Sequence, residues 1–244
     1  MSGAITVATA ARVLAQLRRD PRTIALLLVV PAGLITLIRF VFDDQATFDR
    51  VGGTLIGVFP LFTMFLVTSI TMLRERTTGT LERLMAMPLA KLDLLAGYGI
   101  AFALLASVQA LVTSAVAFLA LGFDPAGAPA LIAGLAVLNA VLGSALGLLA
   151  SAFASSEFQA VQFMPAFVLP QILLCGLLVP REQMADGLAA VASVLPLTFA
   201  FDALDAVGTE GADLGGVADD VAVLVGMSAA AIALAALTLR RRTA

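Results

Sequence analysis

The chain has 244 residues, of which 61% are hydrophobic and 13% charged, with a formal net charge of −3. Soluble domains are about half apolar and about a quarter charged, so much of this apolar surface must face lipid. The composition therefore predicts an all-α polytopic membrane protein. A sequence without histidine excludes imidazole acid–base chemistry and His-ligated metals, and a single cysteine, Cys175, excludes an intramolecular disulfide and a cysteine-based metal site.

Residues 4–20 predict an amphipathic helix that ends at Asp20-Pro21. The apolar residues of its broad stripe are Ile5, Val7, Ala8, Ala11, Leu14, Ala15 and Leu17, and the arginines at its polar edges are Arg12, Arg18 and Arg19. We expect this helix to lie on the inner membrane surface. From the pattern alone, a positively charged flank of the first span explains these residues equally well.

Six apolar runs are long enough to cross a bilayer as helices, which takes about 20 residues. They are residues 24–42, 54–73, 94–122, 130–153, 158–180 and 221–239. The first is longer than the apolar core of a signal peptide, so we expect it to be a span. Residues 188–201 are too short to span and contain Pro196. They predict a re-entrant helix, broken at that proline, within an extracellular segment 181–220.

The charges predict the orientation of the six spans. One side receives the N-terminus, residues 74–93, residues 154–157 and the C-terminus, and it holds eleven of the 14 basic residues. By the positive-inside rule this side is cytoplasmic, so both termini are predicted to lie in the cytoplasm. Spans two to six carry no ionisable residue at mid-depth, which argues against a proton- or sodium-coupled transporter.

The stretch 73–89, LRERTTGTLERLMAMPL, gathers charges between two apolar runs. We expect Thr77, Thr78 and Gly79 to break the helix that continues from the second span, and a short interfacial helix to follow and end at Pro88. Glu75 with Glu82, and Arg76 with Arg83, form polar stripes at a spacing of seven residues. From the residues alone, a charged turn that only enforces topology is the simpler interpretation.

This stretch resembles the first cytoplasmic loop of the ABC-2 type permeases, the membrane subunits of a class of ATP-binding-cassette exporters. Residues 174–204, with Pro180 before a loop and Pro196 before an aromatic-Asp end, resemble the last extracellular stretch of the same family. The resemblance extends over essentially the whole chain and is greatest to daunorubicin-resistance-like drug-export permeases of actinobacteria. It implies a multi-pass permease of a bacterial cytoplasmic membrane that exports a hydrophobic or amphipathic compound.

In that family the loop after the second span inserts as a coupling helix into the ATPase subunit. The resemblance therefore implies ATPase contacts through Arg74, Glu75, Arg76, Gly79, Thr80, Glu82 and Arg83 within segment 74–90. Glu157, in the second cytoplasmic turn, is the expected companion. Ser156 and Gln159 predict a capping box there, and a helix cap without a coupling role is the simpler interpretation of that turn.

The energy source is predicted to lie in a partner. The only lysine, Lys91, follows no glycine-rich loop, so this chain has no phosphate-binding motif and is not expected to be an enzyme. The resemblance implies two ATPase subunits, which bind ATP and Mg, and a second permease chain, identical or homologous. We expect no cofactor or metal in this chain and no nucleic-acid partner; membrane lipid and a hydrophobic small molecule complete the expected partners.

Two further residue sets have candidate roles. Residues that recur every four positions in span four, and so favour close helix packing within the subunit or between permeases, are Asn139, Gly143, Gly147 and Ser151. Flexible or flat side chains that suit a path for amphipathic substrates are Phe59, Phe62, Met64, Phe65, Phe163, Met164 and Phe167, with Gln171 as a polar member. Core or lipid-facing packing explains most of this second set as well. Gln109 and Asn139 are expected to hydrogen-bond between helices.

Two other functions fit parts of the sequence. Exporters of lipid-linked glycans or other polymers share the same architecture. An intramembrane lipid-modifying enzyme would need organised acids, and Asp186, Asp202 and Asp205 are present without a recognisable catalytic motif.

Overall fold

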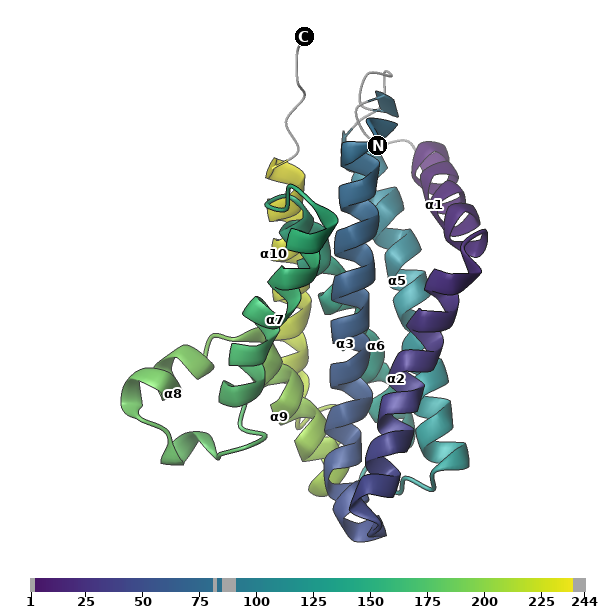
Figure 1. Ribbon diagram of the computed structural model, residues 1–244. Coiled ribbons are helices and arrows are strands. Elements are labelled where there is room, and N and C mark those ends of the chain that lie inside the picture. The colour runs from purple at the N-terminus through teal and green to yellow at the C-terminus, as the bar shows by residue number, and fades with distance from the viewer. Residues whose placement is uncertain (1–2, 81–82, 85–90, 239–244) are drawn as a thin grey trace.

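The computed structural model describes residues 3–80, 83–84 and 91–238, and these residues form helices and connecting turns without a strand (Figure 1). The helices are α1 (Gly3–Arg18), α2 (Pro21–Phe42), α3 (Gln45–Thr77), α5 (Lys91–Ala115), α6 (Pro129–Ser151), α7 (Glu157–Leu174), α8 (Asp186–Ala192), α9 (Pro196–Thr209) and α10 (Ala218–Thr238), with a π-helical turn η1 (Val116–Ala120) and a 3₁₀ turn η2 (Arg181–Gln183).

Within these described ranges, five helices are long and apolar enough to cross a bilayer: α2, α3, the helix through residues 96–120, α6 and α10. A sixth is reached if α8 and α9, which meet at 81°, are counted as one broken span. The prediction of an all-helical fold with several candidate membrane spans is confirmed for the described residues. The start of α1, the end of α3 and the end of α10 lie at one end of the bundle (Figure 1), and the assignment of that end to the cytoplasm remains a prediction.

Helix α3 is the longest element and the centre of the bundle (Figure 1). Its 33 residues extend about 50 Å at 1.5 Å per residue, well beyond a hydrocarbon core of about 30 Å. It begins at Gln45, where the carboxylate of Asp44 accepts a hydrogen bond from the backbone N–H of Thr47 at 2.8 Å, and it ends at Thr77. Both ends therefore project beyond the apolar layer, and charged residues near Thr77 can meet water.

Helix α6 packs on α3 through the glycines predicted for close contact. A Cβ at Gly143 would lie 2.2 Å from the carbonyl oxygen of Leu61, and one at Gly147 would lie 2.4 Å from that of Phe65. Any larger side chain would push the two backbones apart, so the sequence of α6 determines how near α3 can lie. These two glycines thus have their contacts inside the chain.

The buried side-chain amides of Gln109 and Asn139 have different surroundings. Gln109 of α5 donates a hydrogen bond to the hydroxyl of Thr63 in α3, as the sequence predicts. Asn139 of α6 is 1% exposed, yet neither amide atom has a hydrogen-bond partner among the described residues. Its side chain lies against Gly57, where a Cβ would come within 2.8 Å of Nδ2. The prediction of an interhelical hydrogen bond is wrong for Asn139.

The fifth crossing differs from the continuous span predicted for 158–180. Helix α7 ends at Leu174, and the chain then leaves the bundle as an arm that contains η2 and α8 before α9 begins at Pro196 (Figure 1). The side-chain oxygen of Gln171 accepts a hydrogen bond from the backbone N–H of Leu197 at 3.2 Å, so the start of α9 lies beside the end of α7. Prolines at 165 and 170 weaken α7. The predicted fifth crossing is therefore divided between two helices, α7 and α9.

Helix α1 packs on α5 with a face that the sequence does not single out. Its buried residues are Thr6, Thr9, Ala10, Val13 and Leu17. A Cβ at Gly97 of α5 would lie 2.5 Å from Cβ of Thr9, so the two helices touch closely there. Most of the predicted apolar stripe, including Val7 at 66% exposed, faces outward. Because that outer side is free of the bundle, it stays available for the predicted contact with membrane lipid.

Candidate functional site

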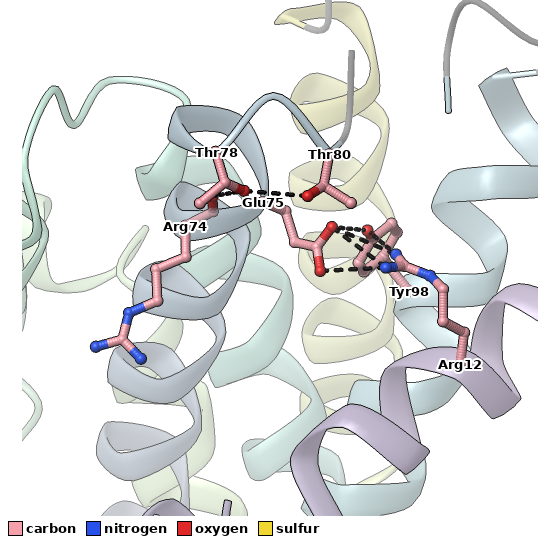
Figure 2. Close-up of polar contacts among 6 residues, drawn as sticks. All are labelled: Arg12, Arg74, Glu75, Thr78, Thr80 and Tyr98. Carbon is pink, nitrogen blue, oxygen red and sulfur yellow. Dashed lines mark hydrogen bonds and ion pairs between the residues drawn. The ribbon is translucent and has the colours of Figure 1, made fainter. Parts of the chain in front are cut away.

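The end of α3 carries a buried carboxylate that joins three helices. Glu75 is 3% exposed, and its carboxylate lies between Arg12 of α1 and Tyr98 of α5 (Figure 2). The Arg12 guanidinium donates to both carboxylate oxygens at 3.4–3.5 Å, and the Tyr98 hydroxyl donates to Oε2 at 2.9 Å. Arg12 also donates to the Tyr98 hydroxyl. We call Arg12, Glu75 and Tyr98 the buried triad.

The composition of the triad follows from what a buried charge requires. A carboxylate removed from water is stable only when a counter-charge and hydrogen-bond donors replace its hydration. Arg12 supplies the charge and keeps 35% of its side chain exposed, while Tyr98, fully buried, supplies a neutral donor. The triad therefore holds the amphipathic helix α1 in a defined position against α3 and α5.

Arg74, the preceding residue, points to the opposite side of α3 (Figure 2). Its Nε and Nη2 donate to the two carboxylate oxygens of Glu157 at 2.7 and 3.0 Å, which is the paired geometry that suits arginine and a carboxylate. These bonds lower the pKa of the Glu157 carboxyl below its ordinary value of 4.5. The pair therefore persists at neutral pH, and its contribution is lost only as the pH falls through the lowered pKa.

Arg76 adds a third connection. Its Nη1 donates to the carbonyl oxygen of Ser151, in the last turn of α6, at 2.7 Å. Consecutive residues of α3 thus connect to four other helices: Arg74 to α7, Glu75 to α1 and α5, and Arg76 to α6. A displacement of the end of α3 would be transmitted to each of these helices.

We call residues 74–76 and their bonds to the four helices the junction. The chain turns directly beyond it. Gly79 has φ of +72°, a left-handed conformation that a side chain would disfavour, so the predicted break of the helix is found there. Thr78 donates from its hydroxyl to the Arg74 carbonyl oxygen at 2.7 Å and lies 3.1 Å, hydroxyl to hydroxyl, from Thr80 (Figure 2). Arg83 is exposed. Glu82 and the predicted helix end at Pro88 lie outside the described residues.

The predicted coupling residues therefore separate into two groups. Arg74, Glu75, Arg76 and Glu157 bond to other parts of the same chain, and Glu75 is turned into the bundle. Thr80 and Arg83 lie beyond the turn at Gly79, with Arg83 on the surface. At the neighbouring turn Ser156 caps α7 by accepting from the Gln159 N–H at 3.2 Å, but the Gln159 side chain accepts from Ser155 rather than completing the predicted box with Ser156.

A second feature is an apolar groove of about 380 Å³ between α3, α6 and α7. It brings together three of the predicted path residues, Phe65, Phe163 and Phe167, with Leu146 and Phe153 among its other walls. The rings of Phe65 and Phe167 stack at 6.2 Å between centroids. Such a surface can hold a flat or flexible apolar molecule.

The other predicted path residues do not line this groove. Met64 is fully buried in the core, and Phe59 and Phe62 pack against core clusters. Met164 is partly exposed. Gln171 is occupied by the start of α9 and, through Nε2, by the carbonyl oxygen of Phe167 at 3.1 Å. The spacing of aromatic residues in the sequence does not distinguish side chains that line the groove from side chains that pack in the core.

Sequence reasoning missed two members of the buried triad. The pattern of residues 4–20 predicts only that Arg12 lies at the polar edge of a surface helix, and no motif includes Tyr98. A usable signal exists for Tyr98, because it is the chain's single tyrosine and lies just inside a span, where a polar hydroxyl needs a partner.

A family model and two curated relatives match this chain. The family described as ABC-2 type transporter matches residues 5–207. The "Probable multidrug ABC transporter permease YbhR" of Escherichia coli (strain K12) is 30% identical over 144 residues, 59% of this chain and 39% of that protein. The "ABC transporter G family member 20" of Dictyostelium discoideum is 27% identical over 148 residues, 61% of this chain and 20% of that protein. The matched regions thus cover less than half of either relative.

Proposed function

Because the chain belongs to the ABC-2 type transporter family, we propose that it is the permease subunit of an ATP-driven exporter. It would move a hydrophobic or amphipathic compound out across the cytoplasmic membrane. The observation that carries this proposal is the junction at the end of α3, where three consecutive charged residues connect to four helices directly before a turn.

The junction supports a division of labour within the predicted coupling segment. Residues beyond Gly79, including Thr80 and Arg83, would contact the ATPase, and residues 74–76 would pass the movement into the bundle. Buried and paired groups suit the second task, because they make the end of α3 move together with its neighbours. A solvated surface charge such as Arg83 suits an interface that is remade in every cycle.

The ATPase itself would be a separate chain that binds ATP and Mg. Two such subunits and two permease chains would form the working transporter. The YbhR relative is named as a probable multidrug permease, and the groove walls are almost wholly apolar side chains. Both observations favour an apolar or amphipathic cargo over a glycan, whose hydroxyls would find few partners in such a groove.

The proposal is tested by binding and by hydrolysis. We expect an ATPase encoded beside this chain to co-purify with it and to hydrolyse ATP faster when an apolar drug is added. Arg83→Glu should weaken ATPase binding at least about tenfold, because it reverses a charge at the interface. Arg50→Glu, at an exposed arginine near the other end of α3, is the matched control and should leave binding unchanged. The proposal fails if no ATPase binds, or if both variants behave alike.

A further inference from the structure

A second groove lies between α2 and α3. It is distinct from the groove between α3, α6 and α7, which is lined by phenylalanines and which we call the aromatic groove. The second groove has a volume of about 300 Å³, and its apolar walls include Leu26 and Val30 of α2 with Leu66, Val67 and Ile70 of α3. Leu26 is 63% exposed and Val30 is 37% exposed, so the groove opens to the outside of the chain. At the depth of a membrane span, that outside is lipid hydrocarbon.

One end of this groove is polar and cationic. Thr23, Thr71 and Arg74 line it, and Thr23 and Arg74 lie beside the turn from α1 to α2. That turn carries three more arginines, all exposed: Arg18, Arg19 and Arg22. One arginine therefore lines this end of the groove, and three more lie on the adjacent turn.

The acids at this end are engaged elsewhere. Asp20 caps α2, because its carboxylate accepts from the Thr23 N–H at 3.2 Å and from the Thr23 hydroxyl at 2.7 Å. Glu157 accepts both hydrogen bonds from Arg74. Four arginines against these two carboxylates leave a net positive charge, and the three arginines of the α1–α2 turn are exposed.

We propose that this groove binds an anionic phospholipid, with one acyl chain between α2 and α3 and the phosphate beside Arg19 and Arg22. One lipid molecule carries both an apolar chain and an anionic group, which is the combination that the groove and its mouth present. Cationic pockets between spanning helices on the cytoplasmic side are suited to anionic headgroups. The site is separate from the aromatic groove and needs neither ATPase nor transport.

The headgroup half of the proposal is tested on the purified full chain in detergent, by native mass spectrometry with phosphatidylglycerol and phosphatidylcholine of the same acyl chains. We expect phosphatidylglycerol to be retained in preference. The double variant Arg19→Gln/Arg22→Gln should weaken its binding about 25-fold, from about fivefold for each arginine near an anionic headgroup. Arg50→Gln is the control for loss of an exposed arginine elsewhere. Equal retention of both lipids, or equal weakening by the control, would overturn the proposal.

The position of the acyl chain in the groove is tested by a matched pair of variants. Leu26→Trp fills the groove, whereas Val29→Trp changes a side chain of similar exposure, 65%, on the same helix outside the groove lining. We expect Leu26→Trp to reduce phosphatidylglycerol retention at least fivefold and Val29→Trp to leave it unchanged. If Leu26→Trp has no effect, the lipid is not held in this groove. Because the readout is lipid retention by the chain alone, its failure would leave the proposed export function untouched.

Discussion

At the scale of single residues, the charges of the stretch 73–89 are explained by where each side chain points. Glu75, Arg74 and Arg76 follow one another in sequence but lie on different sides of α3, since successive helical residues are about 100° apart. Glu75 turns inward and needs compensation from Arg12 and Tyr98. Three adjacent positions at the end of one helix can thus bond to partners on four other helices.

The triad makes Arg12 important for stability. Arg12→Ala removes the counter-charge of a buried carboxylate and leaves Tyr98 as its donor. A hydrogen bond to a charged group contributes about 1.5–3 kcal/mol, so we expect a loss of about 2 kcal/mol, or roughly 5 °C in the melting temperature for a chain of this size. Arg18→Ala, on the same helix and exposed, is the control and should change little. Equal melting temperatures of the two variants, measured by thermal unfolding in detergent, would contradict this role.

Asn139, unlike Arg12, is expected to lower the stability of the fold. Its amide is buried without a partner among the residues described, and an unpaired buried polar group costs about 1–3 kcal/mol. Asn139→Leu should therefore raise the free energy of unfolding by about 1 kcal/mol after repacking beside Gly57, and so raise the melting temperature by about 3 °C. A fall in the melting temperature would contradict this prediction. Ser144→Ala is a suitable comparison, because the Ser144 hydroxyl already donates to the Ala140 carbonyl oxygen at 3.0 Å.

At the scale of elements, the sequence predicts the helices of long apolar runs well and the broken ones poorly. Runs around α2, α6 and α10 shift by three residues or fewer at either end, because uniform apolar composition defines all three and a proline begins α2 and α6. The run 158–180 is also apolar, but Pro165 and Pro170 weaken its helix, and Gly176, with φ of +105°, follows directly after the helix has ended at Leu174. The contact of Gln171 with the start of α9 is a tertiary one, so sequence spacing could not reveal it.

The arm between α7 and α9 is fixed at one point by an ion pair. Arg181 of η2 donates from Nη2 to Asp202 of α9 at 2.8 Å, with both side chains only partly exposed. Such a pair contributes about 1 kcal/mol, so Arg181→Ala should speed local hydrogen exchange of the arm about fivefold. The double variant Arg181→Asp/Asp202→Arg should restore part of the protection. Glu182→Ala, at the next residue and exposed, should leave exchange unchanged; a similar acceleration there would rule out the pair as the fixing point.

The candidate site is predictable from the sequence only in part. The break at Gly79 and the gathering of charge around it follow from composition and turn chemistry. The partners of those charges come from α1, α5, α6 and α7, which are up to 83 residues away in sequence. Residue types alone show that Glu75 needs a counter-charge once buried, but they do not show that it is buried or that Arg12 supplies it.

At the scale of the whole molecule, the junction and the aromatic groove share their walls. The groove is lined by α3, α6 and α7, and the junction connects α3 to α6 through Arg76 and to α7 through Arg74. In the proposed transporter, a displacement of the turn beyond Gly79 would therefore be passed through packed helices to all three walls of the groove. Movement imposed at that end of the chain would then change the shape of the proposed cargo surface.

This connection predicts that the Arg74–Glu157 pair matters more for coupling than for stability. The pair is about half exposed on both sides, so Arg74→Glu should cost no more than about 1 kcal/mol. In the assembled transporter, however, it should reduce drug-stimulated ATP hydrolysis several-fold, because α7 no longer follows α3. Glu157→Arg should act alike, and the double variant Arg74→Glu/Glu157→Arg should recover most of the stimulation while ATPase binding stays constant throughout. If the double variant is as impaired as the single ones, Arg74 and Glu157 act on the ATPase directly rather than through each other.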